Sequence, residues 1–230
     1  MQRYYSNIYW HFTGSPNVNW HLVKKPGDIQ KYGVPKLDRE AVDILLRILQ
    51  SKKLLAKCTE KISDTMITEH FCSTTDIPFK DLVTHSPYYG RVAIGFTARA
   101  IHKKFMPVLY IPVHNMPFIN RILTNMEIQG EKEAGGQLAY TYSGVREVDS
   151  SQIAGFLMNF LKVTDFGARE GDSLYREREW RHLGHFNFDV RDVAAIVVPQ
   201  DYISELSVYL AGDRYLHNVS LISWEFIENS

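Results

Sequence analysis

The sequence has 230 residues, 45% of them apolar, which is long enough for one sizeable hydrophobic core. Lysine plus arginine and aspartate plus glutamate number 26 each, so the charge does not indicate a protein that coats nucleic acid or an anionic membrane. Cys58 and Cys72 are too few for a disulfide scaffold or a four-cysteine zinc site, and no apolar run is long enough to span a membrane. We therefore expect a cytoplasmic protein with no membrane partner and no metal.

The first element is a predicted aromatic strand that ends at His11 and Thr13 and turns through Gly14. Two interpretations of His11 are open: a half-buried histidine satisfied by a carbonyl, or a residue that lines a cleft. Residues 17–37 mix proline, glycine and lysine without a period, which predicts a loop placed to cover a pocket. Asp38 then begins a predicted helix over 38–54, with Asp38 as its N-cap and apolar residues at helical spacing.

The remaining elements follow in an order that does not alternate between strands and helices. The pattern predicts strands at 92–96, 108–113, 138–143, 174–181, 194–198 and 219–226, and helices at 117–126, 152–162 and 201–210. Such an order is typical of an α+β fold rather than a doubly wound parallel sheet, and no Gly-rich phosphate loop is present. We expect one domain over residues 1–230.

Residues 71–96 contain a strand, a turn and a short helix, followed by Tyr88, Tyr89 and Gly90. The two tyrosines could pack at the edge of a core. Alternatively, a tyrosine beside a glycine offers a flat face on which a planar ring can stack.

The run LYREREWR at 174–181 is the most informative stretch. Strand alternation would place Tyr175, Glu177, Glu179 and Arg181 on one side, and neither side of the strand is cleanly apolar. One interpretation is an exposed ladder of charge pairs, which contributes little to stability. The interpretation we favour is a site in which Glu177 and Glu179 stabilise developing positive charge.

These motifs together resemble the AbiGi family of bacterial abortive-infection proteins. The resemblance rests on HFTG at 11–14, TDIP at 75–78, Tyr89-Gly90, IGF at 94–96 and YREREWR at 175–181, in that order over residues 8–185. Members of that family act in phage defence and are usually described as the antitoxin partner of a toxin. The resemblance implies a toxin or a phage protein as a partner.

The same order more distantly resembles the ADP-ribosyltransferases, which implies a split, mostly antiparallel sheet and NAD as co-substrate. By that resemblance His11 and Thr13 would hold a ribose of NAD, and Tyr89, with Tyr88 as the alternative, would stack on nicotinamide. Glu179 would be the catalytic carboxylate, preceded by Glu177. The target would be a protein or a nucleic acid. No clear serine-threonine-serine strand accompanies these residues.

Two functions therefore compete. One is an NAD-consuming transferase that acts in phage defence. The other is a non-catalytic antitoxin or sensor that holds a toxin or a nucleotide in the same cleft.

Overall fold

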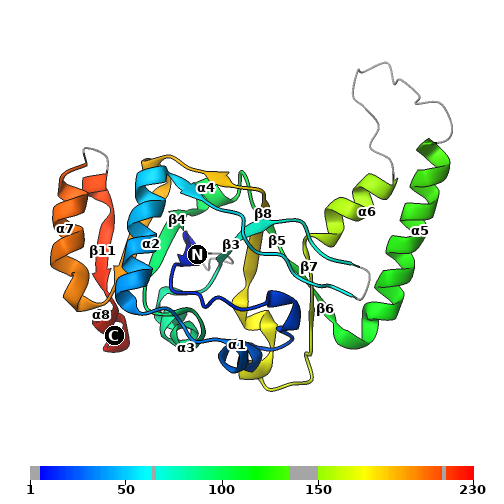
Figure 1. Ribbon diagram of the computed structural model, residues 1–230, viewed down its shortest axis with the longest axis horizontal. Coiled ribbons are helices and arrows are strands. Elements are labelled where there is room, and N and C mark those ends of the chain that lie inside the picture. The colour runs from blue at the N-terminus through cyan, green and yellow to red at the C-terminus, as the bar shows by residue number, and fades with distance from the viewer. Residues whose placement is uncertain (1–5, 64–65, 135–149, 214–215) are drawn as a thin grey trace, which may run out of the picture.

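The centre of the molecule is a seven-stranded sheet (Figure 1). The computed structural model describes residues 6–63, 66–134, 150–213 and 216–230. In spatial order the strands are β11 (Ser220–Ser223), β10 (Val193–Val198), β4 (Ala93–Thr97), β1 (Ile8–Phe12), β3 (Phe71–Thr75), β8 (Glu179–Leu183) and β5 (Met106–Pro107). Only β10 and β11 run parallel within this sheet. The predicted α+β class and mostly antiparallel sheet are confirmed.

Two short strand pairs flank the sheet. They are β2 (Lys53–Leu54) with β9 (Phe186–Asn187), and β6 (Leu109–Pro112) with β7 (Leu161–Thr164). The helices are α1 (Pro26–Tyr32), α2 (Asp38–Ser51), α3 (Ser86–Tyr89), α4 (Ala98–Ile101), α5 (Met116–Ala134), α6 (Ser150–Met158), α7 (Ile203–Ala211) and α8 (Trp224–Glu228). Within the described ranges, no helix has both the length and the apolar character to cross a bilayer.

Strands β1 and β3 are joined much more weakly than their neighbours. Residues of β1 pair with β4 at five positions, from Ile8 opposite Thr97 to Phe12 opposite Ala93. Between β1 and β3 the register contains one pair, Trp10 opposite Thr75. The two strands therefore separate after Trp10, toward the C-terminal end of β1.

Helices cover both faces of the sheet. On one face, α2 and α7 bury Leu45 and Leu206 in a core that also holds Tyr9 and Ile94. On the other face, Trp224 of α8 packs with Trp10, Leu82 and Ala93. A separate small core joins α5 and α6 to β6 and β7 at the end of the molecule opposite α7 (Figure 1).

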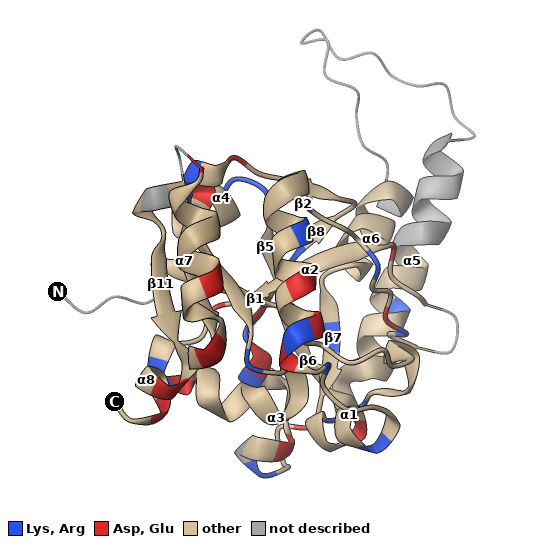
Figure 2. Ribbon diagram, turned by 60° about the vertical axis from the view of Figure 1, so that its left-hand side comes forward, with Lys and Arg blue, Asp and Glu red and all other residues tan. Residues whose placement is uncertain are grey.

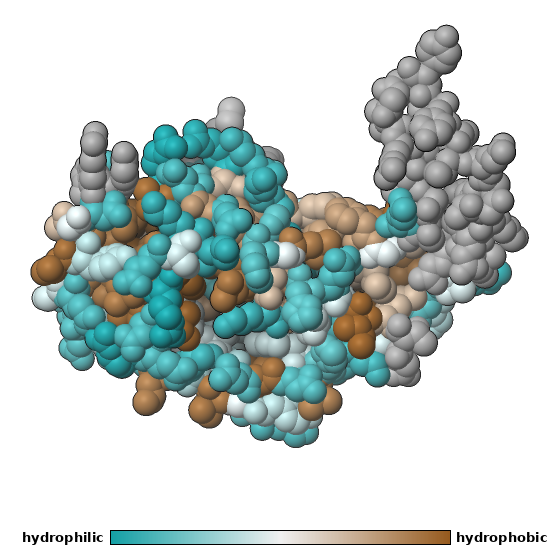
Figure 3. Space-filling view, turned by 45° about the horizontal axis from the view of Figure 1, so that its top comes forward, coloured by the Kyte–Doolittle hydropathy of each residue, from teal (hydrophilic) through white to brown (hydrophobic). Residues whose placement is uncertain are grey.

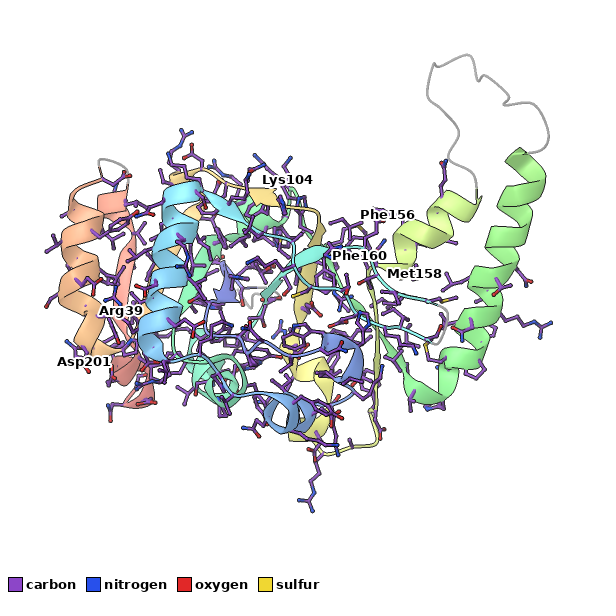
Figure 4. All side chains as sticks on the ribbon, in the orientation of Figure 1. Arg39, Lys104, Phe156, Met158, Phe160 and Asp201 are labelled. Carbon is purple, nitrogen blue, oxygen red and sulfur yellow. The ribbon has the colours of Figure 1, made fainter. Side chains whose placement is uncertain are left out.

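Helix α2 forms over most of the predicted range 38–54, but it ends at Ser51, because Lys52 is left-handed with φ of 51° and Lys53–Leu54 form β2. Its apolar residues Val42, Leu45 and Leu49 are buried, and charged residues occupy its exposed side. Asp38 is the first helical residue rather than the N-cap, which is Leu37. Arg39, labelled on α2 in Figure 4, pairs with Glu205 of α7 and ties the two helices together.

The predicted loop over residues 17–37 is partly wrong, because it contains a helix. In α1, Pro26 stands at the first position, where a missing N–H costs nothing, and Asp28 accepts bonds from the Lys24 and Lys25 amides. Ile29 is fully buried and anchors the helix. One buried residue per turn is too weak a period to detect in sequence.

The predicted strand over 174–181 is also wrong in its first half. Residues Leu174–Glu177 form a 3₁₀ helix, and Arg178 adopts a left-handed conformation with φ of 44° before β8 begins. Tyr175 is consequently exposed instead of sharing a side with the glutamates.

The other predicted elements are close to the observed ones. Strands 92–96, 108–113 and 194–198 correspond to β4, β6 and β10, and helices 117–126, 152–162 and 201–210 to α5, α6 and α7. Residues 219–226 form a strand only to Ser223, whose side chain then caps α8. The strand at 138–143 lies outside the described residues.

Candidate functional site: a divided cavity with a buried charge cluster

A cavity of about 1500 Å³ lies where β1 and β3 part, between α2 and the segment 53–60. Ligand pockets usually have ~300–1,000 Å³, so this cavity is large. His11, Thr13, Tyr89, Glu177 and Glu179 all line it, although 168 positions separate the first from the last. Tyr88 does not line it. Figure 2 shows basic and acidic positions interspersed along the ribbon near α2.

The cavity has one half on each face of the sheet. Paired residues share a face and successive residues alternate. Trp10 pairs with Thr75 and Thr75 with Glu179, so these three lie on one face. His11 pairs with Ile94 and lies on the opposite face, which α2 covers. His11 and Glu179 therefore reach the same cavity from opposite faces.

We name the half of the cavity on the face that α2 covers the α2 half. It is lined by His11, Thr13 and Thr74, with Ile44 and Ile48 of α2. We name the half on the opposite face, which carries Trp10 and Thr75, the charged half. It is lined by Tyr89, Lys162, Glu177 and Glu179.

The charged half is built on Lys162, a β7 residue whose side chain is buried. Its Nζ donates to Glu177 Oε2 at 2.6 Å, to Glu179 Oε2 at 2.9 Å and to Glu60 Oε1 at 3.0 Å. Arg181, which is fully buried, donates to both oxygens of Glu179 and also to Glu60. We call these five residues the charge cluster. Two cations thus hold three carboxylates.

The cluster drives the two glutamate pKa values apart. Burial raises the pKa of Glu177 and outweighs the attraction of Lys162. Burial acts in the same direction on Glu179, but Arg181 and Lys162 together overcome it and lower its pKa to about 2. Burial also opposes the charged form of Lys162, yet Glu177, Glu179 and Glu60 raise its pKa well above the usual value. Such separation occurs in acid–base sites and in structural ion-pair networks.

Tyr89 lines the cavity but is held by three neighbours, Glu177, His85 and Phe12. Its hydroxyl donates to Glu177. Its ring stacks with the His85 ring and packs against the Phe12 ring, with 6.3 Å and 5.8 Å between ring centroids. Burial, followed by the charge of Glu177, raises the pKa of the phenol. Neighbours thus occupy much of the surface that a nicotinamide ring would need.

The Thr13 hydroxyl is already hydrogen-bonded within the protein, whereas one ring nitrogen of His11 can still bind a ligand. The Thr13 hydroxyl donates to the Ala41 carbonyl at 2.8 Å and is 4% exposed, so it fastens β1 to α2. His11 Nδ1 lies 2.8 Å from the Ser73 carbonyl. A carbonyl only accepts, so Nδ1 carries the proton and Nε2 of the neutral ring is an acceptor. Burial lowers the pKa of His11, which favours that neutral form.

Tyr88 lies outside the cavity. Its ring is 5.3 Å from the guanidinium of Arg176, a cation–π contact. The structure thus brings five of the six sequence-predicted residues to one cavity and leaves Tyr88 beside it.

Sequence reasoning missed Lys162 and Glu60, which complete the charge cluster. Lys162 fell at the end of a predicted helix that in fact stops at Met158. The available signal was one lysine within the apolar run from Phe160 to Val163, since a buried lysine requires partners. Among the described residues, no group of three or more histidines, cysteines or carboxylates is arranged to hold a metal ion.

Comparison with known proteins identifies the family. A family model described as "Putative abortive phage resistance protein AbiGi, antitoxin" matches residues 44–223. The chain belongs to the AbiGi family. The match includes Tyr89, Glu177, Glu179 and Lys162, whereas His11 and Thr13 precede it. No curated protein and no solved structure matches this AbiGi chain. The likeness to ADP-ribosyltransferases and the cytoplasmic location stay predictions.

Proposed function

We propose that this AbiGi chain is the antitoxin of an abortive-infection pair and neutralises a toxin protein by binding it. The observation that carries the proposal is the match of residues 44–223 to a family described as an antitoxin. The charge cluster argues against the competing enzyme. Glu179 accepts hydrogen bonds at both oxygens from Lys162 and Arg181, so its negative charge is already compensated. A carboxylate that must stabilise a new positive charge gains less when two cations hold it. The family's description as an antitoxin supports the same function.

The surface is compatible with a protein partner. Figure 3 shows hydrophobic residues at several places among the polar ones on the face in view. Large exposed apolar side chains on α5 and α6 include Phe118, Phe156 and Leu157. Aromatic and aliphatic side chains of this size are available for contact with a protein partner.

A second candidate, an NAD-dependent ADP-ribosyltransferase that modifies a protein or a nucleic acid, rests on one observation. His11, Thr13, Tyr89, Glu177 and Glu179 line one cavity large enough for a dinucleotide. Against it stand the opposite faces of His11 and Glu179, the engaged hydroxyl of Thr13 and the packed ring of Tyr89.

Growth and nicotinamide release separate the two functions. The toxin is sought as a neighbouring gene whose product stops growth when expressed alone. Co-expression of this chain should restore growth, and the purified chains should co-elute. A chain that stops growth by itself, or that releases nicotinamide from NAD, would contradict the antitoxin function.

Glu179→Gln, with Glu60→Gln as its matched control, sharpens the test. Both variants remove one carboxylate charge from the same cluster, so both should lower stability. If the chain is an antitoxin, the wild type and both variants should release no nicotinamide. In a transferase, Glu179→Gln alone would reduce release about 10²–10³-fold, while NAD binding would change far less.

A further inference from the structure

Two polar groups in the α2 half of the cavity have no hydrogen-bond partner in the part of the chain that the structure describes. The Thr74 hydroxyl has no partner among residues 6–63, 66–134, 150–213 and 216–230, although Thr74 is 3% exposed and lines the cavity. His11 Nε2 has none among the described residues, since only Nδ1 is engaged. A buried hydroxyl without a partner costs about 1–3 kcal/mol. Such a group in a cavity wall is accounted for if a ligand supplies the missing bond.

These two groups are neighbours. His11 follows Trp10 and Thr74 precedes Thr75, so both residues lie on the α2 face, one position beyond the single β1–β3 pair. The His11 ring lies beside β3, since its Nδ1 is 2.8 Å from the carbonyl of Ser73, the residue next to Thr74. His11 Nε2 accepts a hydrogen bond, and the Thr74 hydroxyl can donate one. The pair is therefore complementary to a ligand edge that carries an N–H donor beside an acceptor, as nucleobases do.

The wall beside this pair is apolar. Ile44 and Ile48 lie one turn apart on the flank of α2, and Leu54 follows from β2. Apolar walls next to a few fixed polar groups are typical of small-molecule binding sites.

The outer part of the same half is basic. Lys36, Arg47, Lys53 and Lys57 line it together with one carboxylate, Glu40. Arg47 and Lys57 are exposed to solvent, and none of the four cations forms an ion pair with a carboxylate of the described residues. A net positive rim attracts a phosphate group.

We propose that the α2 half binds a nucleoside phosphate, with its base edge on His11 and Thr74 and its phosphate at Arg47, Lys53 and Lys57. The site requires neither Glu177 nor Glu179, so it is a binding site separate from the charge cluster. It requires no toxin either, so a failure of the antitoxin proposal leaves it untouched.

Equilibrium binding to the full chain tests the proposal. The probes are the four ribonucleoside 5′-monophosphates and their diphosphates, the matching nucleosides, and inorganic phosphate and pyrophosphate, each at low and high salt. We expect at least one nucleotide to bind about tenfold more tightly than its nucleoside and than either inorganic anion. The affinity should fall with salt, because the rim is exposed. Equal binding of nucleotides and inorganic anions would overturn the base contacts, and with them the proposal.

Thr74→Val is the decisive variant, because it separates binding from folding. It keeps the shape of the side chain and removes a hydroxyl that has no partner, so Tm should stay the same or rise. Nucleotide affinity should fall about tenfold. A lower Tm with unchanged affinity would show that the hydroxyl serves the fold and would overturn the proposal.

The rim is tested with Lys53→Met, and Lys52→Met is the matched control, since Lys52 is adjacent but does not line the cavity. Lys53→Met should weaken nucleotide binding severalfold and reduce its salt dependence, while Lys52→Met leaves both as in the wild type. Equal effects of the two substitutions would contradict a phosphate position at Lys53.

Discussion

Gly14 and Gly90 pack backbone against backbone. A Cβ placed on Gly14 would lie 2.8 Å from the Tyr89 carbonyl oxygen and 3.2 Å from the Gly90 Cα. Gly90 itself has φ of 82°, a conformation that favours glycine. This contact brings the end of β1 against the end of α3 and sets the position of Tyr89 in the cavity.

Gly14→Ala should destabilise the protein by about 1–3 kcal/mol, because the backbone around Tyr89 must move to admit a methyl group. The urea midpoint measures the loss. Gly27→Ala is the control, since Gly27 lies in α1 with open space around its Cα. Alanine is the better helix former, so this change should be neutral or slightly stabilising. A Gly14→Ala protein as stable as the wild type would contradict the close contact.

Lys162→Met should cost about 3–5 kcal/mol near pH 7, because it leaves Glu60, Glu177 and Glu179 with Arg181 as their one cation within the cluster. The deficit relative to wild type should shrink as the pH falls from 7 toward 4, since protonation removes the uncompensated charge. Denaturant unfolding at several pH values measures both effects.

Arg191→Met is the control for Lys162→Met, because Arg191 and its partner Asp189 are exposed to solvent. Its effect should be much smaller. Similar losses for the two variants, or a deficit for Lys162→Met that does not depend on pH, would count against a buried charge cluster.

The sequence predicts the parts of this fold whose patterns are local. Helix α2 repeats its apolar residues at helical spacing, and β4 and β10 are short apolar runs, so each forms where expected. Helix α1 escapes detection because only Pro26 and Ile29 are buried.

The site depends on long-range geometry that no local pattern contains. The sequence pattern placed Glu177 and Glu179 together by assuming a continuous strand, which the structure does not contain. The left-handed Arg178 breaks the strand, and Lys162 then draws both carboxylates together. The division of the cavity between two faces follows from the register of β1 and β3, whose paired residues Trp10 and Thr75 are 65 positions apart in sequence.

Stability should fall as the pH drops below about 6.5. Burial lowers the pKa of His11 and of His85 in the folded protein, so the unfolded chain takes up protons first. Each group can contribute up to about 1.4 kcal/mol per pH unit, from the unfolded pKa of 6.5 down to its lowered folded value. His11→Asn, whose amide can still donate to Ser73, should reduce the slope of unfolding free energy against pH between 7 and 5. An unchanged slope would rule out a neutral, buried His11.

Hydrogen exchange should divide residues 17–37 into two parts. The Gly33 amide donates to the Ile29 carbonyl in α1, and the Ile29 side chain is fully buried, so this amide should exchange slowly in the free protein.

The 3₁₀ turn Trp20–Leu22 buries no residue, although Asn17, Val18 and Trp20 line the cavity. Its amides should exchange quickly, and a ligand in the α2 half should slow them. Ile29→Ala should release the whole segment to fast exchange, because it truncates the larger of the two buried side chains of α1, Pro26 and Ile29. Slow exchange at the Leu22 and Val23 amides of the free protein would show that this segment is no lid, and fast exchange at Gly33 would show that α1 is not anchored.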